Sequence, residues 1–254
     1  MQSTNARTCP VYEHTAGTEI AFSGIRPGGL DLTRRALAWC RFPPGATILD
    51  VGCGTGITVE HLIAGHKLRG IGIDASPVLL KLGRDRNPAG PVVRGAGENL
   101  PFPDEYADGI LAECSLSVMA DPAAALDEFR RVLKNDGTLV LSDVYVRNPG
   151  FAQSSAPIQA KCCLNGAATR EALTDRLAGR GFAIRLWEDH SERLKDFAVQ
   201  LILAYGSLNE FWKQTIPALA HPGDIQRSIS RMQPGYFLLI AQKSGGSNVM
   251  EGSR

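Results

Sequence analysis

An apolar run that leads into alternating glycines, Ile48-Leu49-Asp50-Val51-Gly52-Cys53-Gly54-Thr55-Gly56, is the most informative part of this sequence. The apolar residues are typical of a buried strand. The glycines are typical of a tight turn whose backbone approaches another group closely. A helix is expected to open at Thr55 and to continue through residues 57–62. A strand, a glycine turn and a helix N-terminus in this order form a cradle for a nucleotide or a nucleotide-like cofactor.

The glycine spacing and a later acid narrow the choice of cofactor. A dinucleotide fingerprint, G-x-G-x-x-G, would need a glycine where this chain has Ile57. The next apolar segment, 68–73, is expected to be a strand, and it leads to Asp74, 20 positions beyond Gly54. A carboxylate there can accept hydrogen bonds from ribose hydroxyls and repels a 2′-phosphate. The alternative for Asp74 is a helix cap, although Ser76-Pro77 can fill that role.

The rest of the chain alternates between strand and helix patterns. Apolar segments at 91–94, 106–113 and 138–145 are expected to be strands, and Asp121-Pro122 is expected to start a helix. This alternation over 46–145 predicts an α/β fold with a doubly wound, largely parallel sheet. Beyond residue 150 we expect a helix over 170–180, a strand over 182–187, a long helical stretch over 194–212 and a last strand over 236–241.

Two motifs resemble a known family. The order acid-x-G-x-G-x-G, from Asp50 to Gly56, resembles motif I of the class I S-adenosylmethionine (SAM) dependent methyltransferases. Residues 95–102 resemble the family segment G-D-A-E-x-L-P-F, with Ala96 at the Asp that usually bonds the adenine amino group. The resemblance implies a Rossmann-like, seven-stranded sheet whose last strand is antiparallel, and SAM as the methyl donor. Adenine would then be held by backbone around Gly97 and by apolar stacking.

The resemblance also implies a set of site residues and an acceptor class. Expected at the cofactor are Asp50, Gly52, Cys53, Gly54, Asp74, Ala75, Gly97, Glu98, Glu113 and Cys114. The expected function is methyl transfer to a small-molecule acceptor, with Tyr12, Cys162 and Cys163 as candidate acceptor-binding residues. Two alternatives remain besides this one: a nicotinamide oxidoreductase, and a non-catalytic SAM-binding module.

The cysteine pair suggests a further alternative. The strand 142–145, followed by Cys162-Cys163 and Gly166-Ala167, resembles the arsenite methyltransferases, in which cysteines hold a trivalent metalloid. Cys114 or Cys9 would complete the set. That group has another cysteine further along, whereas this chain has none after Cys163. The simpler interpretation is a pair of small, half-buried residues.

The expected chemistry requires no prominent base. The methyl group of SAM is carried on a sulfonium, which is already a good leaving group, so alignment in a dry pocket can supply most of the acceleration. A thiolate acceptor needs no base, whereas an oxygen or carbon acid needs one. His14, His190 and Tyr12 are the nominees. The catalytic residues are otherwise left unassigned.

The domain plan has three parts. Residues 1–22 show little periodicity, and a helix capped by Asp31 is expected to follow. The segment 1–45 either covers the sheet or forms a lid, with Tyr12 or Arg26 reaching the methionine end of the cofactor. The methyltransferase domain is expected over 46–243, with a helical cap insertion at about 190–233, and a disordered tail over 244–254.

Composition limits the partners and the location. The chain has 27 basic and 26 acidic residues, so no nucleic acid and no anionic membrane surface is expected as a partner. The first residues lack the apolar core of a signal peptide, and no apolar run approaches the ~20 residues of a membrane span, so a cytoplasmic location is expected. Neither C-x-x-C nor a His-Cys cluster occurs, and no metal site is expected.

Overall fold

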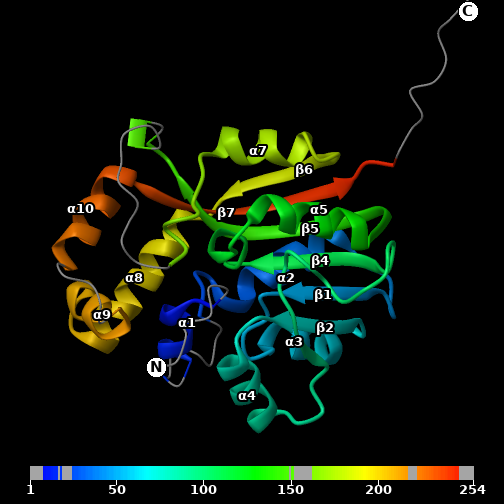
Figure 1. Ribbon diagram of the computed structural model, residues 1–254, viewed down its shortest axis with the longest axis horizontal. Helices are drawn as coiled ribbons and strands as arrows, with labels where there is room; N and C mark the ends of the chain where they lie inside the picture. The colour runs from blue at the N-terminus through cyan, green and yellow to red at the C-terminus, as the bar shows by residue number, and fades with distance from the viewer. Residues whose placement is uncertain are drawn as a thin grey trace, which may run out of the picture.

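The computed structural model describes residues 8–16, 18, 25–148, 150–151, 162–216 and 222–245. It contains one seven-stranded sheet in the order β3-β2-β1-β4-β5-β7-β6 (Figure 1). β7 runs antiparallel to both of its neighbours, and the remaining pairs are parallel. This confirms the predicted fold class. The strands are β1 (Thr47–Val51), β2 (Arg69–Asp74), β3 (Val92–Arg94), β4 (Ala107–Glu113), β5 (Leu133–Val146), β6 (Phe182–Asp189) and β7 (Pro234–Lys243).

Helices cover both faces of the sheet because successive strand residues point to opposite sides. In β1, Ile48 packs with α2 (Gly29–Cys40) and α3 (Ile57–His66) on one face. Its neighbour Leu49 packs on the other face with α5 (Pro122–Val132) and α7 (Arg170–Ala178). Both residues are fully buried. A smaller cluster joins α3 to α4 (Pro77–Arg86) beside β3. These layers make the sheet a rigid platform for whatever lies at its edge.

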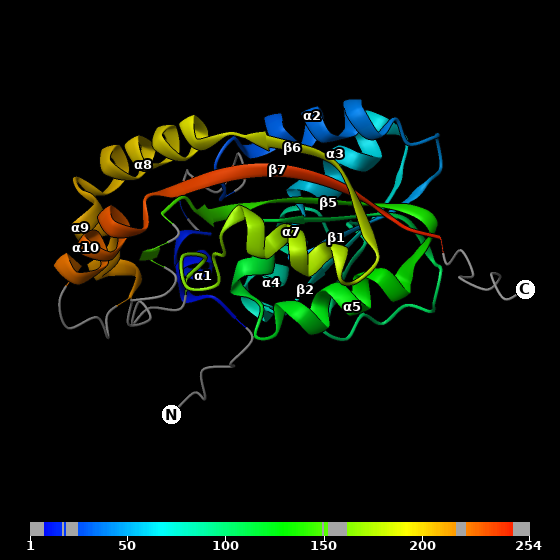
Figure 2. The same ribbon diagram turned by 90° about the horizontal axis from the view of Figure 1, so that it is seen from above.

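Four helices gather at the carboxyl edge of the parallel strands. They are α1 (Pro10–Thr15), α8 (Ser191–Tyr205), α9 (Leu208–Thr215) and α10 (Pro222–Met232). The three later ones lie between β6 and β7 in sequence and stand at one end of the molecule (Figure 2). α1 packs against α9. In the described part of the chain, no helix is both long and apolar enough to cross a membrane.

The structure corrects several expected element bounds. The predicted long helical stretch over 194–212 is two helices: α8 ends at Tyr205, with Gly206 (φ +81°) as its C-cap, and Ser207 caps α9 through its hydroxyl. The second helix of the chain begins at Gly29, so Asp31 lies in its first turn and does not cap it. β5 starts at Leu133, ahead of the strand expected over 138–145.

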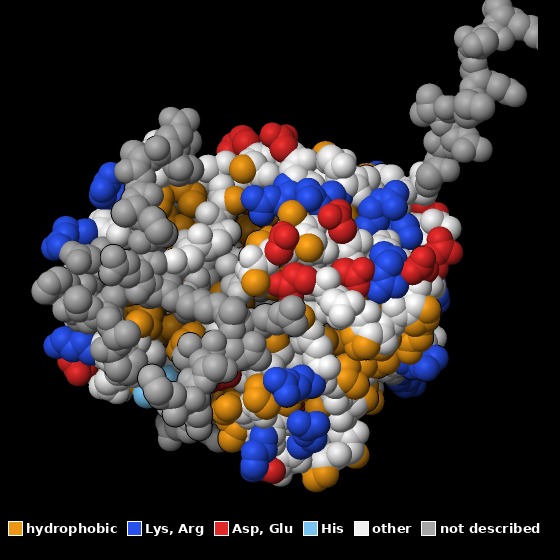
Figure 3. All heavy atoms as spheres, viewed as in Figure 1, with side chains coloured by type: hydrophobic (Ala, Val, Ile, Leu, Met, Phe, Trp, Pro, Cys, Tyr) orange, Lys and Arg blue, Asp and Glu red, His pale blue; other side chains and the backbone are white. Residues whose placement is uncertain are grey.

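Two further differences concern the ends of the chain. α1 forms within a segment that shows little periodicity, because six residues are too few to display a stripe; Pro10 starts it. The expected tail falls mostly on residues 246–254, which lie outside the described residues. On the face seen in Figure 3, acidic and basic side chains are interspersed over the region of α5 and α7.

Candidate functional site

The glycine turn after β1 takes a conformation that other residues rarely adopt. Gly52, Gly54 and Gly56 have φ values of +85°, +56° and +82°. A Cβ on Gly52 would lie 2.3 Å from the Cβ of Ser115, whose hydroxyl donates to the carbonyl of Val51 at 2.6 Å. A Cβ on Gly54 would meet nothing within 4 Å. The turn therefore packs tightly against Ser115, just after β4, on one side and faces open space at Gly54.

Asp74 closes this turn from the end of β2. Its carboxylate accepts hydrogen bonds from the backbone N–H of Gly54 at 2.8 Å and of Ser76 at 2.7 Å. The helix-cap role belongs instead to Ser76, whose hydroxyl accepts from the N–H of Leu79. Burial raises the pKa of Asp74 above its usual value, and the backbone hydrogen bonds oppose that rise. Each carboxylate oxygen keeps a second lone pair for a ligand.

A buried charge cluster lies beside the turn. Arg26 forms an ion pair with Glu113 at 3.0 Å, and the two side chains are 11% and 2% exposed. Thr33 donates to Glu113 at 2.8 Å, and Arg26 donates to both Thr33 and Thr58 at 2.9 Å. The cluster thus fastens the N-terminal segment to β4 and α3. Sequence reasoning missed the two threonines, because a lone threonine in a helix carries no functional signal.

Asp50 adds a second carboxylate to this cluster. It is 2% exposed, and burial together with the charge of Glu113 raises its pKa to about 8, while Arg26 opposes the rise. Two carboxylates face one guanidinium, so full ionisation would leave a net negative charge. The cluster is therefore suited to a neighbouring cation.

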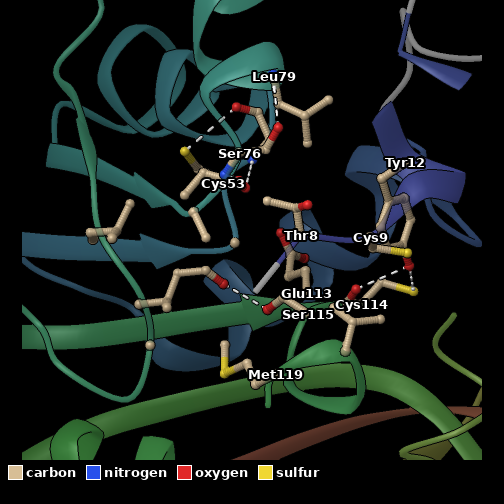
Figure 4. A pocket seen from close by; sticks show the side chains of 18 of the residues that line it. Thr8, Cys9, Tyr12, Cys53, Ser76, Leu79, Glu113, Cys114, Ser115 and Met119 are labelled. Atoms are coloured by element: carbon tan, nitrogen blue, oxygen red, sulfur yellow. Dashed lines mark hydrogen bonds between the residues drawn. The ribbon is translucent and has the colours of Figure 1, made fainter. Parts of the chain in front are cut away.

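A pocket at the carboxyl edge collects most of the expected cofactor residues (Figure 4). Nine of the ten line it: Gly52, Cys53, Gly54, Asp74, Ala75, Gly97, Glu98, Glu113 and Cys114. Asp50 is not among the lining residues. Glu98 accepts hydrogen bonds from the N–H groups of Ala120 and Asp121, so its carboxylate holds the turn before α5. The fold thus brings residues from the ends of four strands, β1 to β4, into one wall.

The expected adenine end is closely packed. Ala96, Gly97 and Met119 line the pocket there. A Cβ on Gly97 would lie 2.7 Å from the sulfur of Met119. The Met119 thioether therefore packs closely against the backbone of Gly97, and both line this end of the pocket.

The N-terminal helix α1 contributes Tyr12 to the wall of this pocket. Glu13 accepts a hydrogen bond from the hydroxyl of Ser76 at 2.5 Å. Tyr12 donates to the carbonyl oxygen of Cys114 at 3.1 Å and approaches its sulfur at 3.0 Å (Figure 4). Cys114 itself has a φ of +55°, a strained conformation for a residue with a side chain. Two contacts thus join α1 to the ends of β2 and β4.

A second cavity, of about 280 Å³, adjoins the first. The two share Cys9, Tyr12, Ile25 and Cys114 in their linings. Its other walls come from α8, α9 and residues 162–164, with side chains such as Phe197, Leu201, Phe211 and Trp212. The candidate acceptor residues lie here: Tyr12 lines both cavities, and Cys162 and Cys163 line the second one.

Four cysteines that are far apart in sequence meet at this cavity: Cys9, Cys114, Cys162 and Cys163. Among the described residues, none of the four is in a disulfide. Burial raises the pKa of Cys162 to about 12, and a hydrogen bond with Cys114 together with burial raises that of Cys163. Among the described residues, no group of three or more His, Cys, Asp and Glu side chains has a geometry that could hold a metal ion.

The histidine nominees lie elsewhere. His14 is exposed on α1, and His190 contacts Glu188 at 3.0 Å just before α8. Neither lines either of the two cavities.

The sequence is similar to known methyltransferases over about half of its length. Residues 49–141 match the family profile described as "Methyltransferase domain". A demethylmenaquinone methyltransferase of Corynebacterium kroppenstedtii is 36% identical over 121 residues, which are 47% of this chain and 52% of that protein. The chain spans about half the length of the curated relatives it matches.

Solved structures share the fold over most of the chain. The [4+2]-cyclase SpnF is 28% identical with a TM-score of 0.67, covering 85% of this chain and 80% of SpnF. The phosphoethanolamine N-methyltransferase 2 of Haemonchus contortus, solved with S-adenosyl-L-methionine, has a TM-score of 0.68. The two sequences are 17% identical, and the match covers 92% of this chain and 56% of the Haemonchus chain. This likeness therefore shows the fold alone.

Proposed function

Because residues 49–141 belong to the class I S-adenosylmethionine-dependent methyltransferases, we propose that this protein transfers a methyl group from SAM to a small-molecule acceptor. The observation that carries the proposal is the glycine turn held by Asp74, with open space in front of Gly54. A backbone cradle next to a carboxylate fits an adenosyl group, because the carboxylate can accept from ribose hydroxyls while the bare turn lies against the rest of the ligand.

Named residues account for each end of the cofactor. Asp74 binds the ribose, and the backbone of 96–97 with Met119 surrounds the adenine. The cluster of Arg26, Glu113 and Asp50 lies at the methionine end, where the cofactor's ammonium and sulfonium groups favour the ionised form of Asp50 and so balance the second carboxylate. The absent adenine-reading Asp at Ala96 is replaced by backbone groups and packing.

The chain's contribution to the reaction is alignment and exclusion of water. The cofactor supplies a methyl group on a positively charged sulfur, which leaves readily. α1 serves as the lid, fastened through Glu13 and Tyr12 to the ends of β2 and β4. Burial raises the pKa of the Tyr12 phenol well above its usual value, so at neutral pH Tyr12 acts as a hydrogen-bond partner and not as a base.

The other functions considered have less support. The glycine spacing lacks the third glycine of a nicotinamide site. A metalloid acceptor would need a cysteine set with binding geometry, which the described residues do not provide. One similar structure is described as a [4+2]-cyclase, so cofactor binding and methyl transfer must be scored separately in any test.

The test is transfer of labelled methyl from SAM to a panel of small-molecule acceptors that includes hydroquinones, thiols and amines. The proposal predicts a labelled product with at least one acceptor, and loss of that product with Asp74→Ala. Tight SAM binding with no transfer to any acceptor in the panel would favour a non-catalytic module instead.

A further inference from the structure

The second cavity differs in chemistry from the cofactor pocket. Among the described residues that line it there is no carboxylate, and its two cations, Arg147 and Lys195, are exposed side chains. The remaining lining is aliphatic, aromatic or thiol, apart from the hydroxyls of Thr15 and Ser191. Thr15 donates its hydroxyl hydrogen back to the carbonyl of Val11 at 2.8 Å, so it offers the cavity little polarity.

The thiols add to this apolar character. Because burial raises the pKa of Cys162 to about 12, its sulfur is neutral at physiological pH, and the same holds for Cys163. A neutral buried thiol behaves as a small hydrophobic group. The convergence of four cysteines is therefore compatible with an apolar ligand and gives no charge for a polar one.

The size of the cavity indicates the size of its ligand. A dry protein cavity of roughly 150 Å³ lined by Leu, Ile and Phe binds benzene. At about 280 Å³, this cavity has room for roughly twice that ligand, a system of about two fused rings. Aromatic walls from Phe197, Phe211 and Trp212 can stack on such a molecule.

The junction of the two cavities fixes the ligand's orientation. Tyr12 and Cys114 line both spaces, and the Tyr12 hydroxyl lies between them. A molecule in the second cavity would direct one end at this junction and thus at the cofactor pocket. The phenol can hydrogen-bond an oxygen or nitrogen on that end.

We propose that the second cavity is the acceptor site and that the acceptor is an apolar, aromatic molecule of about two fused rings, presented at the Tyr12–Cys114 junction. This inference rests on the proposed function, because the ligand of this cavity is a methyl acceptor only if the protein transfers methyl groups. The binding chemistry of the cavity, however, can be measured without any methyl transfer.

The experiment titrates the full chain with 6-acetyl-2-dimethylaminonaphthalene, a two-ring dye whose fluorescence rises in apolar sites, and then adds 1-naphthol or phosphoethanolamine as a competitor. S-adenosylhomocysteine binding is measured separately by calorimetry. Ala198→Trp fills the cavity from α8, and Ala204→Trp, on the exposed side of the same helix, is the matched control. Ala198→Leu is a milder filler in case the tryptophan prevents folding.

The proposal predicts saturable dye binding that 1-naphthol displaces and phosphoethanolamine does not. Ala198→Trp, or Ala198→Leu to a smaller extent, should raise the dye's Kd at least about tenfold and leave S-adenosylhomocysteine affinity within about twofold; Ala204→Trp should change neither. Dye binding that survives both fillers, or displacement by phosphoethanolamine, would overturn the acceptor class. Absence of S-adenosylhomocysteine binding by the unaltered chain would instead overturn the proposed function.

Discussion

The backbone N–H of Gly54 donates a hydrogen bond to the carboxylate of Asp74 across 2.8 Å, and so joins the turn after β1 to the end of β2. The bond leaves the glycine's open side facing the pocket. The same carboxylate thus shapes the turn and remains available to a ligand.

Replacing Asp74 by Ala should weaken S-adenosylhomocysteine binding by roughly 1–3 kcal/mol, because charge-assisted hydrogen bonds to the ribose are lost. Calorimetric titration measures the change. Asp85→Ala is the control, since Asp85 is an exposed acid on α4 paired with Lys81. Equal affinity of the Asp74 variant and the unaltered chain would show that the ribose partner lies elsewhere.

Alanine at Gly52 and at Gly54 should have different consequences. At Gly52 the new Cβ meets Ser115 at 2.3 Å and the φ is unfavourable, so the free energy of unfolding should fall by roughly 2–5 kcal/mol. At Gly54 the Cβ meets open space, so the fall should be only about 1–2 kcal/mol, from the positive φ.

The Gly54 variant should nevertheless lose the cofactor, because its methyl group projects into the space the ligand needs. Urea unfolding and calorimetry on the two variants separate stability from binding. If Gly54→Ala binds S-adenosylhomocysteine normally, the ligand does not lie against this turn.

Removal of Arg26 should destabilise the fold strongly. Arg26→Met leaves Glu113 buried at 2% exposure without its ion-pair partner, for which a loss of roughly 3–5 kcal/mol is expected. Urea unfolding measures it. Arg34→Met is the matched control, since its pair with Asp31 is exposed and should contribute little. Similar losses in both variants would mean that the buried cluster is not what holds the N-terminal segment.

Asp143 should make stability depend on pH. Burial raises its pKa to about 6 from an ordinary value of 3.8, although hydrogen bonds from Ser117 and Val144 oppose the rise. The folded chain therefore binds this proton more tightly than the unfolded chain. The resulting stabilisation is present below pH ~4, is lost as the pH rises to ~6, and amounts to about 3 kcal/mol in all.

The comparison with Asp143→Asn isolates this effect. The difference in unfolding free energy, unaltered chain minus variant, should decrease by up to that amount between pH 4 and pH 7, because the Asn variant cannot titrate there. A difference that stays constant over this range would show that Asp143 is ionised throughout.

The sequence predicted the sheet and the glycine turn from local patterns. A strand, a turn and a helix within about 30 residues can each be recognised from apolar periodicity and glycine placement. Asp74 was predictable for the same reason, since it closes the same βαβ unit. Thr33 was not, because it meets Glu113 only across 80 residues of sequence. The gathering of Cys9, Cys114 and Cys162 at one cavity likewise depends on tertiary packing.

Glu98 shows a second reason why the sequence did not predict every side-chain role. The residue matched a cofactor motif and does line the pocket, yet its carboxylate bonds the N–H groups of Ala120 and Asp121. A sequence motif indicates which residue types a segment needs. It does not indicate whether a given side chain binds the ligand or stabilises a neighbouring turn.

Whether the glycine turn holds an adenosyl cofactor is decided by calorimetric titration of the unaltered chain with S-adenosylhomocysteine, and NADH is the competing ligand. We expect saturable binding of one S-adenosylhomocysteine per chain, loss of that binding in Gly54→Ala, and no heat of binding with NADH. Folded protein that binds NADH but neither S-adenosylhomocysteine nor SAM would contradict this expectation.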